Sequence, residues 1–112
     1  MTQTPLDLFL FEPIVPVDRD LPLEERFARF DAANPHVYMM IVEIARRRTK
    51  MGATRLSMKA IFEELRYERN TYLRRTEKYG LDNSFTALYA RLVRDRESDL
   101  AGLFETRVRK AA

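Results

Sequence analysis

The sequence contains no cysteine and only one histidine, His36. Without cysteine, neither a disulfide framework nor a cysteine-ligated zinc or iron–sulfur site can form, and nothing indicates an oxidising compartment. A single histidine also excludes a histidine-rich metal site. Because His36 directly follows Asn34 and Pro35, where a helix is expected to begin, we interpret it as a structural or surface residue. We therefore expect no metal and no cofactor.

Glycine is scarce too, with three residues in 112. A glycine-rich loop that cradles phosphate groups cannot be built from so few, which disfavours the common nucleotide-dependent reactions. No serine or cysteine nucleophile has a recognisable partner motif, and adjacent glutamates such as Glu63 and Glu64 point about 100° apart on a helix. Distant carboxylates could still converge on magnesium, so a metal-dependent nuclease is kept as the weakest hypothesis. The sequence predicts a protein that is not an enzyme.

Long apolar runs are also missing. The longest, such as Val37–Val42, is far shorter than the roughly 20 residues that cross a membrane. Residues 1–20 contain four acids and no basic region ahead of an apolar stretch, unlike a signal peptide. We expect a cytoplasmic protein that does not contact a membrane.

The sequence does contain enough apolar material for one core. Hydrophobic residues make up 46% of the chain, which favours one cooperatively folding domain. Four of the five prolines lie between Thr4 and Pro22 and disfavour a regular helix there, yet this segment is too apolar for a solvated linker. We predict an extended arm over residues 1–21 and a single helical domain over residues 22–112. The arm is expected to pack on its own core or on a neighbouring subunit.

Local signals predict two helices directly after the arm. Pro22 suits a first helical turn, and the apolar spacing that follows predicts a helix over residues 22–33. Asn34 and Pro35 provide an N-cap and a first-turn proline for the second helix. Its apolar stripe continues until Gly52 provides a C-terminal stop.

Further helices are expected in the second half of the chain. Ser57 can cap a third helix, and a last short helix is expected from Ser98 onwards. After the third helix, the strand-like and turn-forming residues of Asn70–Asn83 favour a short hairpin or an ordered loop. The helix after this loop has three candidate caps: Asp82, Asn83 and Ser84. We predict a mainly α fold with four to five short helices, a small β-hairpin as an option, and a helix-turn-helix or winged-helix-like arrangement.

Charge is distributed unevenly along the chain, whose formal net charge is +3. Residues 1–34 hold seven acidic and three basic residues, whereas residues 46–78 hold eleven basic and four acidic ones. Such a basic middle region is suited to following a phosphate backbone. An ordinary alternative is that these cations complement helix C-termini or form a solvated face.

The candidate nucleic-acid contacts fall into two groups. Basic residues of the middle region are expected to contact phosphates: Arg46, Arg47, Arg48, Lys50, Arg55, Lys59, Arg74, Arg75 and Lys78. Polar groups at the start of the next helix are expected to read bases in the major groove: Asn83, Ser84, Thr86 and, one turn on, Arg91. The choice between DNA and RNA stays open, with double-stranded DNA preferred.

Four segments carry a resemblance to a known family. They are FDAANPHVY at residues 30–38, SMKAIFEELRYE at residues 57–68, YARL at residues 89–92 and DLAGLFETR at residues 99–107. In the order of these motifs, residues 21–109 resemble a family of small uncharacterised proteins of bacteriophages and prophages. The resemblance implies a phage or mobile-element setting and no particular activity.

Two functions follow as hypotheses. The first is a small DNA-binding regulatory or accessory protein that uses a basic helical face. The alternative is a protein–protein adaptor or inhibitor whose apolar arm docks on a partner or on a second copy of the chain, as in a homodimer. The docking residues would then be Leu8, Phe9, Leu10 and Phe11.

Overall fold

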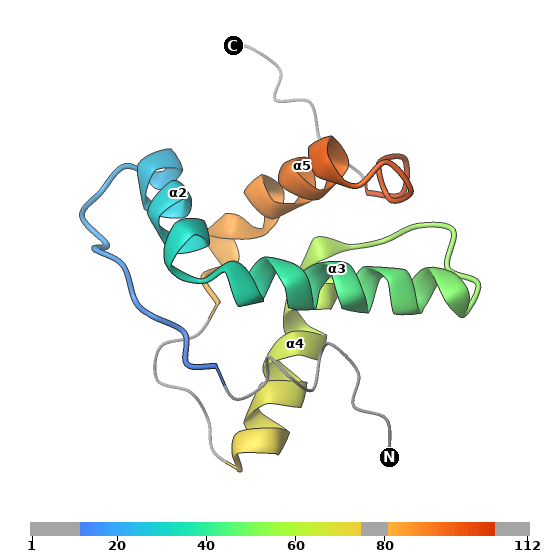
Figure 1. Cartoon of the computed structure of the whole chain (residues 1–112), viewed down its shortest axis with the longest axis horizontal. Helices are drawn as coiled ribbons and strands as arrows, with labels where there is room; N and C mark the ends of the chain where they lie inside the picture. The colour runs from blue at the N-terminus through green and yellow to red at the C-terminus, as the bar shows by residue number, and fades with distance from the viewer. Residues whose placement is uncertain (1–11, 75–80, 105–112) are drawn as a thin grey trace.

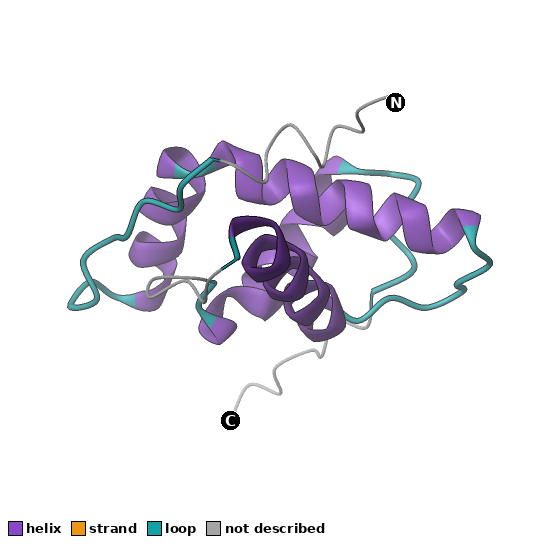
Figure 2. Ribbon diagram, turned by 90° about the horizontal axis from the view of Figure 1, so that it is seen from below, coloured by secondary structure: helices purple, strands orange, loops and turns teal. Residues whose placement is uncertain are grey.

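The computed structural model describes residues 12–74 and 81–104. These ranges contain four α-helices and one short 3-10 turn: α2 (Leu23–Ala33), α3 (Pro35–Lys50), α4 (Met58–Leu73), η1 (Asn83–Phe85) and α5 (Thr86–Arg96). Figure 1 shows α3 crossing in front of α4, with α2 and α5 on the other side of the crossing from the end of α4. Helix α4 packs against both α3 and α5. In Figure 2, which is seen from below, α4 points toward the viewer. The mainly helical fold is therefore confirmed.

Local signals set most of the helix ends. Asn34 alone joins α2 to α3, and Pro35 occupies the first turn of α3. Helix α3 ends before Gly52, whose φ of 99° is in the left-handed region that glycine adopts readily. The Ser57 hydroxyl accepts a hydrogen bond from Ala60 N–H and caps α4, as predicted.

The predicted hairpin over Asn70–Asn83 is wrong where the structure describes it. Asn70–Leu73 form the last turn of α4, and Arg74 ends the helix in a left-handed conformation with φ 56°. No strand occurs in residues 12–74 and 81–104, where the only pairing is an isolated parallel bridge between Leu56 and Phe104. The β-propensity of Thr71 and Tyr72 is a weak local preference. Continuation of α4 overrides it.

The connections between helices also differ from the predicted motifs. A helix-turn-helix has a turn of about three or four residues, but α3 and α4 are joined by residues 51–57, and residues 74–82 separate α4 from η1. Without strands in the described part, the winged-helix-like arrangement has no support. The structure supports a mainly helical class and nothing finer.

The last predicted helix, beginning at Ser98, is also not formed in the described residues. Residues 98–103 make successive turns, in which Leu100 N–H donates to the carbonyl of Glu97 and Leu103 N–H to that of Leu100. Leu100 and Phe104 are buried in the core. We attribute the turns to this burial, because it draws the segment back against the loop before α4, where Leu56 N–H donates to the carbonyl of Leu103.

The apolar stripes of α3, α4 and α5 form most of the core. Val37, Ile41 and Ile44 of α3 are completely buried, because their spacing places them on one helical face. An aromatic group fills the space between α2, α4 and α5: Phe27, Phe30, Phe62, Phe85 and Tyr89. A fully buried phenylalanine such as Phe62 contributes roughly 1.5–3 kcal/mol by leaving water.

The described part of the arm packs on its own chain. Ile14 joins the core, and the Asn34 side chain holds the neighbouring backbone. Val15 N–H donates to Asn34 Oδ1 (2.7 Å), while Asn34 Nδ2 donates to the carbonyls of Val15 (2.9 Å) and Phe30 (3.1 Å). Asn34 precedes α3 as predicted, but its side chain makes no capping hydrogen bond. It fastens the arm instead.

None of the described helices is both long and apolar enough to cross a membrane.

Candidate nucleic-acid interface

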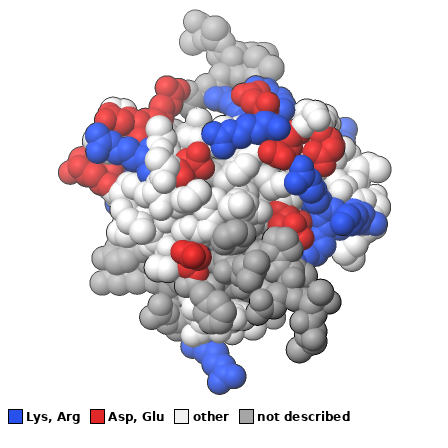
Figure 3. All heavy atoms as spheres, in the orientation of Figure 1, with Lys and Arg blue, Asp and Glu red and all other residues white. Residues whose placement is uncertain are grey.

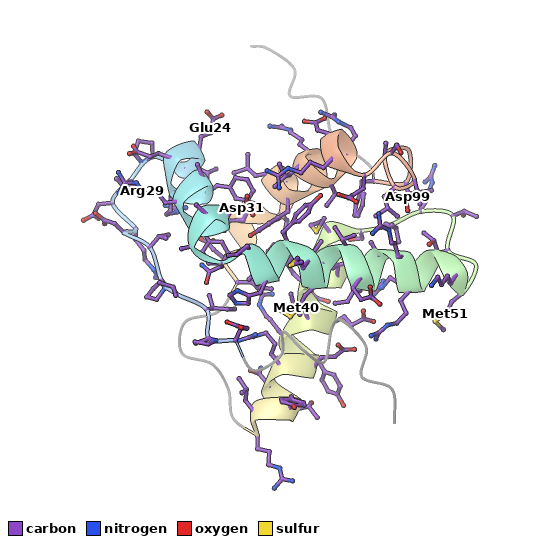
Figure 4. The ribbon with its side chains drawn as sticks, in the orientation of Figure 1. Glu24, Arg29, Asp31, Met40, Met51 and Asp99 are labelled. Atoms are coloured by element: carbon purple, nitrogen blue, oxygen red, sulfur yellow. The ribbon has the colours of Figure 1, made fainter. Side chains whose placement is uncertain are left out.

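Arg46, in the C-terminal half of α3, is held by two acids that follow α5. Its Nη2 lies 2.7 Å from Glu97 Oε1, and its Nε lies 3.1 Å from Asp99 Oδ2. Figure 4 shows Asp99 beside this end of α3. Hydrogen bonding to Asp99, together with Glu97, raises the pKa of Arg46, although desolvation opposes the shift. The same hydrogen bond lowers the pKa of Asp99.

The next two arginines face α4 instead. Arg47 Nη1 lies 3.4 Å from Glu68 Oε1, and Arg48 Nη2 lies 3.3 Å from Glu64 Oε1. Arg46, Arg47 and Arg48 therefore already have carboxylate partners within the fold. A phosphate backbone would have to compete with those partners for each guanidinium group.

Three further cations follow these arginines in the sequence, and we refer to them together as the basic corner: Lys50, Arg55 and Lys59. Lys50 is the last residue of α3, Arg55 lies in the loop, and Lys59 lies in the first turn of α4. All three are exposed, and within residues 12–74 and 81–104 neither lysine makes an ion pair. No acidic residue occurs from Arg46 to Phe62. The basic corner is thus a stretch of exposed positive charge without an acid in its own sequence.

The remaining predicted phosphate contacts do not join this corner. Arg74 is exposed at the opposite end of α4 from Lys59. Arg74 lies 15 positions after Lys59, a distance of about 22 Å along the axis. Arg75 and Lys78 lie outside the described residues.

Three of the four predicted base-reading residues, Asn83, Ser84 and Thr86, make contacts within the fold. Asn83 Oδ1 accepts a hydrogen bond from Arg66 Nη2, and Thr86 Oγ1 donates to the carbonyl of Asn83. Ser84 Oγ donates to Asp82 Oδ1 (2.6 Å). These groups would have to exchange their present partners for base edges.

Ser84, Arg91 and Asp82 have further roles in this region. Ser84 Oγ also accepts from Arg26 Nη2 (3.1 Å), which links η1 to α2. Arg91 is half-buried on α5 and has no ion pair among the described side chains. Asp82, rather than the other two candidate caps, caps η1, because its Oδ1 accepts from Ser84 N–H.

Charges of both signs share the surface seen in Figure 3, where acidic and basic side chains lie next to one another along the upper part of the molecule. This mixing agrees with the ion pairs that α3 makes with α4 and with the residues after α5. On that face, the described side chains do not produce a broad field of one sign. A phosphate contact on that face would therefore depend on individual basic side chains.

Several residues that organise the region are not among the contacts predicted from the sequence. Glu64 and Glu68 are four residues apart and share the face of α4 that meets α3. Arg69, only 1% exposed, continues the apolar spacing of Phe62 and Leu65, and its Nη2 donates to the carbonyl of Glu12 (2.9 Å). The helical period could have identified both features, because it places these side chains on faces that pack.

His36 is buried in the first turn of α3. Among the described residues, no group of three or more His, Asp or Glu side chains is placed to hold a metal ion.

Comparison of the chain with protein-family models, with curated proteins and with solved structures finds no match. The family resemblance inferred from the four sequence segments therefore stays a prediction.

Proposed function

We propose that this chain binds the phosphate backbone of double-stranded DNA through the basic corner, without reading its sequence. The setting that we propose is the one implied by the family resemblance, a small accessory or regulatory protein of a phage or prophage. The observation that carries the binding proposal is the exposure of Lys50 and Lys59 without acidic partners in the described structure. These cations are available to phosphates at no cost in broken ion pairs.

The start of α4 adds to the attraction for anions. A helix N-terminus carries partial positive charge, so acids are stabilising there and cations are not. The first turn of α4 contains Lys59 and no acid, and Arg55 is exposed just before it. The helix dipole does not stabilise Lys59. The dipole and the charge of Lys59 together produce a positive potential that favours phosphate.

Sequence readout is not part of this proposal. Asn83, Ser84 and Thr86 are engaged in hydrogen bonds inside the fold. Phosphate contacts alone position a protein on a duplex and carry no sequence information.

The test is fluorescence anisotropy of a labelled duplex titrated with protein at several salt concentrations. Lys50→Gln/Lys59→Gln should weaken binding and reduce the slope of log affinity against log salt by about two, because each phosphate contact contributes roughly 0.9. Arg29→Gln/Arg94→Gln is the matched control, since it removes the same charge from exposed positions of α2 and α5.

The control should retain most of the affinity and nearly all of the slope. Equal weakening by both double variants would show that net charge alone drives binding and would overturn the basic corner. Absence of binding at low salt would overturn the whole proposal.

The adaptor alternative rests on Leu8, Phe9, Leu10 and Phe11, which lie outside the described residues. It stays a prediction for residues 1–11, because the next residues of the arm pack on their own chain.

A further inference from the structure

The arm closes one side of a cavity that the proposed function does not use. The cavity has a volume of about 340 Å³ and lies between the arm, α2 and the segment around η1. This volume is at the small end of the range found for ligand pockets, about 300–1,000 Å³. It is large enough for a small organic molecule.

The wall of this cavity is largely apolar, and it is built from three separate parts of the chain. Pro16 and Val17 come from the arm, Phe30 comes from α2 and Phe85 comes from η1. Both phenylalanines are buried, with their ring centroids 5.1 Å apart. Such a wall suits a ring or a branched aliphatic group.

The polar part of the wall carries unbalanced charge. Arg19, Arg26 and Asp82 are its charged residues, so two guanidinium groups stand against one carboxylate. Burial alone would raise the pKa of Asp82. Hydrogen bonds from Ser84 and the charges of Arg26 and Arg19 outweigh burial and lower that pKa, so Asp82 is ionised at neutral pH. One positive charge is left over.

Arg26 also has an unused donor. Its Nη1 donates to the carbonyl of Arg19 (3.2 Å), its Nη2 donates to Ser84 Oγ, and its Nη2 lies 3.5 Å from Asp82 Oδ2. Its Nε is buried and has no hydrogen-bond acceptor in the described structure. A buried donor without an acceptor is costly, so a shift of the Arg26 side chain that brought Nε–H to an anion in the cavity would be favoured.

We propose that this cavity binds a small amphiphilic carboxylate, with its apolar body against Phe30 and Phe85 and its charged group at Arg26 and Arg19. The excess guanidinium charge and the unused Nε–H select a monoanion over a neutral molecule of the same shape. The arm belongs to the site because Pro16, Val17 and Arg19 form its outer wall, and the Asn34 clamp at Val15 holds that wall in place.

The experiment compares cyclohexanecarboxylate with cyclohexanecarboxamide, its neutral counterpart of the same shape, on the full chain at neutral pH. Binding is followed by thermal shift and by two-dimensional NMR, which reports the backbone N–H of Val17 and the Arg26 Nε–H directly. The carboxylate should bind about tenfold more tightly than the amide, since a hydrogen bond to a charged partner contributes roughly 1.5 kcal/mol or more. Both reported signals should shift with the carboxylate.

Two variants and one control complete the test. Arg26→Met keeps the apolar volume and should remove the preference for the carboxylate, and Val17→Trp should fill the cavity and abolish binding with both arginines intact. Arg29→Met is the control, because Arg29 lies one turn away, points to solvent and pairs with Glu25 (Figure 4). It should bind like the wild type.

Equal affinity for the amide, unchanged binding by Arg26→Met, or absence of binding at millimolar carboxylate would each overturn the proposal. Binding that survives Val17→Trp would place the ligand elsewhere and would overturn it as well. None of these outcomes depends on affinity for DNA, so this proposal and the proposed function can fail separately.

Discussion

The two ends of α3 are both attached to distant parts of the chain, but by different chemistry. At the N-terminal end, Asn34 is completely buried and uses its amide group to hold Val15 of the arm. At the C-terminal end, Arg46 and its two neighbours are attached by ion pairs whose side chains stay partly in water. One end of α3 is therefore held by a buried, neutral hydrogen-bonded group, and the other by partly exposed ion pairs.

The physical cost of breaking each attachment differs for this reason. Removing the partner of a buried amide or carbonyl leaves a group without water, which costs about 1–3 kcal/mol. Exposed ion pairs are screened and well hydrated when broken, so a typical one is worth at most about 1 kcal/mol. The N-terminal end of α3 should therefore depend on its clamp for stability, whereas the C-terminal end can lose a pair with little effect on the fold.

The largest expected effect is that of Asn34→Ala. Loss of the three hydrogen bonds should lower the free energy of unfolding by about 2 kcal/mol and release the arm, as measured by urea denaturation. Hydrogen exchange at the Val15 amide should become faster, because its acceptor is gone. The control is Asn83→Ala, which loses an exposed contact with Arg66. Equal destabilisation by the two variants would contradict the comparison.

The ion pairs with α4 should contribute much less. Arg47→Gln and Arg48→Gln should each lower the free energy of unfolding by about 0.5 kcal/mol or less, and the difference should shrink at high salt. Urea denaturation at low and high salt measures both effects. A loss of more than about 2 kcal/mol for either variant, independent of salt, would show that this end of α3 behaves like a buried attachment.

The smallest expected effect concerns the ionisation of Asp99. Hydrogen bonding to Arg46 holds the pKa of Asp99 below its ordinary value of 3.8, and Arg46→Gln should return it toward that value. Because the pKa is lowered in the folded state, this contact stabilises the fold above the unfolded pKa. The stabilisation is lost as the pH falls through the folded pKa. An NMR titration of the Asp99 carboxyl carbon tests this, and an identical pKa in both proteins would contradict it.

At each end of α3, the sequence predicts the helix boundary but not the contact that holds it. Asn34 and Pro35 correctly predict where α3 begins, but the Asn34 side chain binds the arm and makes no capping hydrogen bond. At the other end, Gly52 correctly predicted where α3 stops. The sequence of this region did not show that Arg46 would meet Asp99, 53 residues further along.

The candidate interface was predictable only in part for the same reason. The exposed basic corner follows from a run without acids, which is visible in the sequence. That Arg47 and Arg48 face Glu68 and Glu64 depends on how α3 crosses α4. A count of basic residues cannot distinguish a cation that is free for a ligand from one that already has a partner.

By itself, the sequence determined the helical class and the ends of α3, because caps, prolines, glycines and the helical period act over a few neighbouring residues. Tertiary structure decided the rest. It extended α4 through Thr71 and Tyr72 against their β-propensity, paired the arginines of α3 with acids from two other segments, and formed the cavity beside the arm. Each of these depends on which distant segments pack together, and local preferences of a few tenths of a kcal/mol per residue are too weak to settle that.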